Sequence, residues 1–207
     1  MSNNQIGRCA AFAMFGIGVI YAVALITGVA MNGLSQPIVD PLLAIMELLT
    51  LISAPLLLVM MAALHNRAQG DGATASSIAL AFMILAVGTT CAVHFVELTA
   101  LRQLGTAGLI WPSTAYALEL LAWDMFLGLS LVFAAAAFRG AIKGQAMARG
   151  LMLSGCLCLF GLVGPATGNM RLQFIGVLGY AGVLPVVCLM VAQFFRADSA
   201  RDPAVLV

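Results

Sequence analysis

Long apolar runs separated by short polar breaks dominate the pattern of this chain. A helix needs about 20 mostly apolar residues to cross the hydrocarbon core of a bilayer, and each run approaches or exceeds that length. The breaks carry turn residues such as Asn32-Gly33 and Pro165. The pattern predicts an all-α bundle of six transmembrane helices in one integral membrane domain, residues 1–207, with spans at about 10–31, 42–64, 76–101, 113–138, 148–166 and 173–195.

Composition narrows the class of protein further. Apolar residues make up 63% of the chain and charged residues 8%, whereas a soluble domain is roughly 45–50% apolar and about 25% charged. The net charge of +1 gives no reason to expect nucleic acid as a partner. The five cysteines contain no C-x-x-C pair, so neither a disulfide framework nor a zinc site is indicated.

The basic residues predict which way the helices run. Two of the nine, Arg102 and Arg171, fall in or beside the third and fifth connections, on one side of the predicted bundle. The other seven fall on the opposite side, and they are Arg8, Arg67, Arg139, Lys143, Arg149, Arg196 and Arg201. Because cytoplasmic segments carry the excess of Lys and Arg, both termini are predicted to be cytoplasmic. The predicted location is a prokaryotic cytoplasmic membrane.

Four of the eight acidic residues lie inside predicted spans, which is unusual because a charge in the hydrocarbon core costs several kcal/mol. At a rise of about 1.5 Å per residue, Glu47, Glu97 and Glu119 lie roughly 6–9 Å below the outer ends of spans two, three and four. His94 lies one turn deeper than Glu97, and Asp124 lies near the middle of the membrane. The three glutamates therefore share one level, with Arg102, Trp111 and Arg171 at the outer rim.

Helical phase brings some of these residues together. Thr90, His94, Glu97 and Leu101 share a face of span three, and Tyr116, Glu119 and Trp123 form a stripe on span four. Asp124 lies about 140° from Glu119 around the same helix, at 100° per residue. We expect an outward-facing polar pocket between spans two, three and four, with Arg102 and Arg171 at its rim and lined by Glu47, His94, Glu97, Tyr116, Glu119, Trp123 and Asp124.

Three functions suit such a pocket. A His beside carboxylates can exchange protons near neutral pH, and carboxylates with aromatic rings can hold a small or organic cation, so binding or translocation of protons or a cation is the first. A structural or accessory membrane subunit, in which the polar cluster only fixes helix packing, is the second.

The third is a metal-dependent intramembrane enzyme, because His94 and Glu97 have the i, i+3 spacing with which one helix offers two ligands. No cofactor beyond a bound cation is expected. The Gly-rich faces around Gly161 and Gly176 indicate close helix contacts, either within the bundle or in a homo-oligomer.

Overall fold

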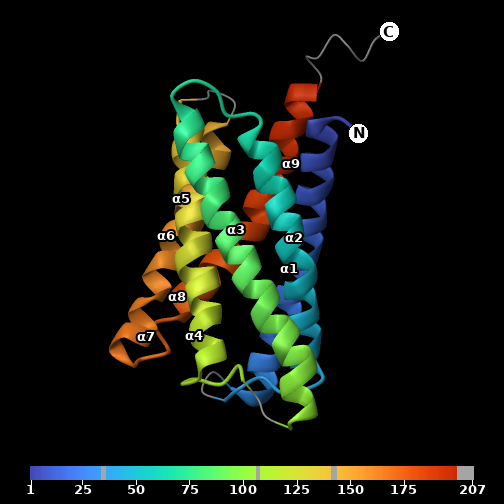
Figure 1. The fold of residues 1–207 in the computed structure, drawn as a ribbon, viewed down its shortest axis with the longest axis vertical. Helices are drawn as coiled ribbons and strands as arrows, with labels where there is room; N and C mark the ends of the chain where they lie inside the picture. The colour runs from blue at the N-terminus through green and yellow to red at the C-terminus, as the bar shows by residue number, and fades with distance from the viewer. Residues whose placement is uncertain (34–35, 106–107, 141–143, 200–207) are drawn as a thin grey trace.

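The computed structural model describes residues 1–33, 36–105, 108–140 and 144–199. Figure 1 shows a bundle of elongated helices in which the chain begins and its last described helix ends at the same end of the bundle, here called the end with the termini. Six helices are long and apolar enough to cross a membrane: Asn3–Asn32, Leu42–His65, Gly72–Leu101, Thr114–Ala137, Gln145–Thr167 and Phe174–Ala197. The predicted all-α architecture with six such helices is confirmed. The sidedness stays a prediction, and two of the basic residues behind it, Lys143 and Arg201, lie outside the described residues.

Four of the six spans are built from more than one helical segment. The first two are the continuous helices α1 (Asn3–Asn32) and α2 (Leu42–His65). The third joins α3 (Gly72–Val96) to the π-helical turn η1 (Glu97–Leu101), and the fourth joins α4 (Thr114–Leu120), η2 (Leu121–Leu127) and α5 (Gly128–Ala137). The fifth contains α6 (Gln145–Gly161) and α7 (Val163–Thr167), and the sixth contains α8 (Phe174–Val177), η3 (Leu178–Val183) and α9 (Leu184–Ser199). π-Helical turns occur frequently at functional sites, and these three lie between the middle of the bundle and the end opposite the termini.

Side-chain caps explain where two of the helices begin. Ser2 accepts a hydrogen bond from the Gln5 backbone N–H, and the Gln5 side chain accepts one from Ser2. This capping box starts α1 at Asn3, several residues before the apolar run that predicted the helix. Ser113 caps α4 by accepting a hydrogen bond from the Tyr116 N–H at 3.1 Å.

The six spans form a closed ring in chain order. Each span packs mainly against the spans before and after it, and α9 of the last span returns to pack along α1 of the first. Six helices in a ring enclose more space than their backbones can fill, so side chains must occupy the centre.

The two halves of the ring are filled differently. The half that contains the termini has an apolar core of fully buried side chains that includes Met60, Met61, Met83, Leu131 and Phe195. The half opposite the termini, here called the distal half, contains all the buried charged residues among those described and most of the other buried polar ones: Glu47, Thr50, Thr90, His94, Glu97, Asp124 and Gln173. The interior therefore changes from apolar to polar along the bundle axis.

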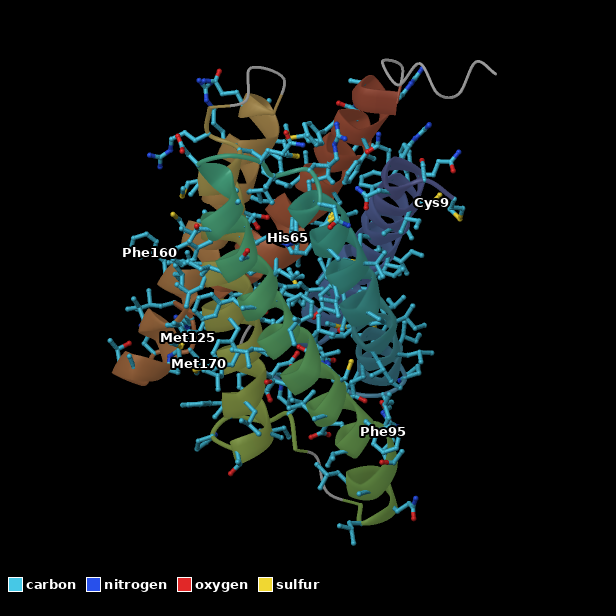
Figure 2. All side chains as sticks on the ribbon, turned by 45° about the horizontal axis from the view of Figure 1, so that its top comes forward. Cys9, His65, Phe95, Met125, Phe160 and Met170 are labelled. Atoms are coloured by element: carbon cyan, nitrogen blue, oxygen red, sulfur yellow. The ribbon has the colours of Figure 1, made fainter. Side chains whose placement is uncertain are left out.

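The outer surface of the bundle carries large apolar side chains. Figure 2 shows Phe95 and Phe160 at the outside of the helices, and each is 61% exposed. A surface of this kind suits contact with lipid, as expected for helices of this length and apolarity.

Candidate functional site

A cavity of about 560 Å³ occupies the distal half of the bundle. Its mouth lies among exposed residues of three connections: Gln36 and Pro37, Ile110, and Asn169 and Arg171. All six spans except the fifth contribute to its wall. The sequence predicted a pocket between spans two, three and four. In the structure, the first and last spans also line the cavity.

His94 and Glu119 form the central polar contact of this cavity. His94 Nε2 lies 2.8 Å from Glu119 Oε1, and the two side chains are 4% and 19% exposed. Both residues line the cavity. Their other polar atoms, His94 Nδ1 and Glu119 Oε2, are buried and have no hydrogen-bond partner within the described ranges. The pair thus joins α3 to α4 and still has unused hydrogen-bonding capacity.

Arg102 connects two carboxylates near the distal rim. It donates hydrogen bonds of 2.8 and 2.9 Å to the two oxygens of Asp40, and its Nη2 lies 3.5 Å from Glu47 Oε2. Glu47 is 2% exposed and lines the cavity, whereas Asp40 is exposed and precedes α2. A buried carboxylate needs a compensating charge, and Arg102 supplies it to Glu47 from outside the cavity.

The Asp40–Arg102 pair predicts a weak dependence of stability on acid pH. Hydrogen bonds from Arg102 hold the pKa of the Asp40 carboxyl below its usual value. A carboxyl whose pKa is lowered by folding stabilises the folded state above its unfolded pKa, and this stabilisation is lost as the pH falls through its folded pKa. We expect wild type to melt slightly above Asp40→Asn at about pH 6 and the difference to vanish near about pH 2–3, as followed by thermal unfolding in detergent. A constant difference across this range would contradict the assignment.

Glu97 is buried but does not line the cavity. Its Oε2 accepts a hydrogen bond of 3.3 Å from the Gly108 N–H, and its Oε1 has no hydrogen-bond partner among the described residues. The Gly108 carbonyl accepts a hydrogen bond from Ser113, the cap of α4. Glu97 therefore anchors the connection that leads from η1 to α4.

Asp124 lies in a second buried polar cluster. Asp124 itself does not line the cavity, but its neighbours Gln173 and Tyr180 do. Asp124 is fully buried, and Gln173 Nε2 lies 3.5 Å from its Oδ2 and 3.4 Å from the Tyr180 hydroxyl. Its Oδ1 is packed against the backbone of Gly161 and Gly176 and has no hydrogen-bond partner in the described part of the chain. Asp124 and Glu119 consequently occupy different places in the bundle.

Of the remaining expected residues, Tyr116 and Trp123 line the cavity and Arg171 stands at its mouth. Sequence reasoning missed Tyr21 on α1 and Tyr180 on η3, which also line it. Each is an isolated tyrosine in an apolar span, so neither belongs to a row of polar residues at helical spacing that would have marked it in the sequence. Both tyrosines lie in the distal halves of their spans, but depth alone does not show which way a side chain faces.

The described residues contain no group of three or more His, Cys, Asp or Glu side chains placed to hold a metal ion. His94 contacts Glu119 on another helix, and Glu97 contacts Gly108. The metal-site hypothesis for His94 and Glu97 stays a prediction.

Comparisons of the chain with protein-family models, curated proteins and solved structures find no match. The function must therefore be inferred from the geometry of the bundle and its cavity.

Proposed function

We propose that this protein binds a cation in the distal cavity at the His94–Glu119 pair, and that the cation exchanges there with a proton. The observation that carries the proposal is the buried Oε2 of Glu119, a carboxylate oxygen at the wall of a cavity with no hydrogen-bond partner among the described residues. A carboxylate oxygen left unpaired in a partly buried position is a ready acceptor for a cation or a proton.

The charges around the cavity support this assignment. Glu47 has Arg102 as its counter-charge, so Glu119 is the carboxylate left to receive a ligand. When His94 carries a proton, the His94–Glu119 pair has no net charge, and an incoming cation would have to displace that proton. When His94 is neutral, Glu119 attracts the cation directly. Binding of a cation is therefore coupled to release of a proton over the pH range in which His94 titrates.

The setting we propose is a multi-pass protein of the cytoplasmic membrane with the cavity mouth on the outer side. The end that contains the termini carries more Lys and Arg residues than the distal end. Such an excess is typical of cytoplasmic segments. The cavity would then exchange its ligand with the outside.

Cation binding can be tested on the detergent-purified protein, without a His tag, by thermal unfolding and by proton release in weak buffer. The panel contains alkali ions, divalent ions and ammonium salts at constant ionic strength. We expect at least one cation to raise the melting temperature and release protons, since a ligand at 100 times its Kd stabilises by about 2.7 kcal/mol. Glu119→Gln should lose both responses.

Asp71→Asn is the control, because it removes an exposed carboxylate next to the start of α3, at the end of the bundle away from the cavity, and it should keep both responses. If no cation affects wild type, or if Glu119→Gln responds as wild type does, the proposal fails and the polar cluster serves only helix packing. Should Glu119→Gln fail to fold, His94→Gln tests the same pair, because it must abolish proton release while leaving Glu119 in place.

A further inference from the structure

All tyrosines and tryptophans of this chain line the distal cavity. The chain has three Tyr and two Trp, and the cavity wall includes Tyr21, Trp111, Tyr116, Trp123 and Tyr180. Only one of the 11 phenylalanines, Phe174, joins them. Aromatic rings with a polar edge are thus concentrated at this cavity, while phenylalanine is used elsewhere in the bundle.

These rings lie close to the acceptor carboxylate and to one another. The ring centroids of Trp123 and Tyr180 are 5.3 Å apart, and those of Trp111 and Tyr116 are 6.1 Å apart. Tyr116 lies one turn from Glu119 on α4, and Tyr21 lines the same cavity from α1. Four spans supply the carboxylate, its His partner and the tyrosines, so the arrangement depends on the fold and not on one helix.

The size of the cavity argues against a bare inorganic ion. About 560 Å³ is in the range of pockets that hold organic ligands, roughly 300–1,000 Å³. A dehydrated metal ion would require several oxygen ligands at about 2–2.6 Å, whereas most of this wall is apolar. Aromatic faces beside a carboxylate are the arrangement that recognises substituted ammonium groups.

The deep part of the wall is mainly apolar, and the Ser53 hydroxyl there already donates a hydrogen bond to the Thr50 carbonyl. Counting from the distal helix ends at about 1.5 Å per residue, Glu119 lies roughly 8 Å deep and Trp123 roughly 14 Å deep. Leu184 and Cys188, which form part of the inner wall with Met14, lie about 15–21 Å deep by the same rise. A ligand that fills this space has a charged end near Glu119 and an apolar body that points toward the middle of the bundle.

We infer that the ligand is an amphiphilic organic monocation, a substituted ammonium whose charged group lies between Glu119 and the aromatic rings and whose apolar part contacts Met14, Leu184 and Cys188. This inference rests on the proposed function and names the substrate class of that site. A single positive charge matches Glu119, which among the described residues is the one carboxylate of the cavity wall without a guanidinium partner.

Intrinsic fluorescence gives a direct test, because both tryptophans of the chain line the cavity. The purified protein is titrated with benzyltrimethylammonium, with tetramethylammonium as the charged group alone, with potassium, and with neutral 3,3-dimethylbutan-1-ol. We expect benzyltrimethylammonium to bind at least tenfold more tightly than tetramethylammonium, and potassium and the alcohol to leave the emission unchanged. Glu119→Gln should abolish the response.

Variants of one ring separate ring recognition from general apolar contact. Tyr21→Leu should weaken binding of benzyltrimethylammonium about 3- to 30-fold, the range measured for cation–ring contacts, and Tyr21→Phe should retain most of it. Phe126→Leu is the matched control, because Phe126 stacks on Phe82 and does not line the cavity, and it should bind as wild type does.

The outcomes distinguish this inference from the proposal beneath it. If potassium or another inorganic ion stabilises wild type and releases protons while the ammonium compounds do neither, the organic-cation assignment is overturned and the cation site at Glu119 stands. If Tyr21→Leu binds benzyltrimethylammonium as tightly as wild type, the role of the rings is overturned. If no cation of either kind binds, both proposals fall together.

Discussion

Replacing Arg102 by Met is expected to destabilise the protein by about 2 kcal/mol, and adding Glu47→Gln to that variant is expected to restore much of the loss. Arg102 is the counter-charge of Glu47, which is 2% exposed. Removing one partner of a fully buried ion pair costs about 3–5 kcal/mol, and this figure is discounted here because the Arg102 side chain is 36% exposed and partly screened by solvent. The free energies of unfolding of the two single variants and the double variant complete a double-mutant cycle.

Arg171→Met is the control for this cycle. Arg171 is exposed at the cavity mouth, and its guanidinium has no ion pair within the described ranges, so its replacement should leave stability within about 0.5 kcal/mol of wild type. A double variant that is as unstable as Arg102→Met would show that Glu47 does not depend on Arg102 for its charge compensation.

Gly179→Ala is expected to destabilise the protein by about 1–3 kcal/mol, the usual cost of overpacking. A Cβ at Gly179 would lie 2.8 Å from the Ser154 carbonyl oxygen and 2.9 Å from the Cys158 backbone nitrogen. Both atoms belong to the backbone of α6, and the Ser154 hydroxyl donates a 2.8 Å hydrogen bond to the Gly179 carbonyl. η3 would therefore have to move away from α6, and thermal or denaturant unfolding in detergent measures the cost.

Gly88→Ala provides the comparison. No described atom lies within 4 Å of the Cβ that this substitution adds in α3, and Ala is a better helix former than Gly by up to about 1 kcal/mol. We expect Gly88→Ala to be neutral or slightly stabilising. Equal losses from the two substitutions would mean that the contact of η3 with α6 is not what constrains Gly179.

The six helices could be predicted because their lengths follow from a single physical requirement. An apolar run must match the thickness of a bilayer, and this sets the number and approximate bounds of the helices without knowledge of their packing. The bounds differ where local hydrogen bonds extend a helix beyond its apolar run, as the Ser2–Gln5 capping box does at the start of α1.

The partners of the polar side chains were less predictable. Helical phase places His94 beside Glu97, but the closest carboxylate to His94 is Glu119 on α4, and Glu97 instead binds Gly108. Pairing between helices depends on how each helix is rotated in the ring, and phase within one helix does not contain that information. For the same reason Tyr21 could not be assigned to the cavity until α1 was seen to close the ring against α9.

The unequal filling of the ring separates the cavity from the end of the bundle that contains the termini. The apolar core of the other half includes Met60, Met61, Met83 and Leu131, none of which lines the cavity, so a ligand that enters at the distal mouth would have to displace these packed side chains to reach the other end. Transfer of a ligand to the other side of the membrane would require this apolar core to rearrange. Methionine is the side chain most able to rearrange without a large energetic cost. Rearrangement of this methionine-containing core would therefore distinguish a protein that only binds the ligand from one that also transports it. These four core residues are not among the residues proposed to bind the ligand.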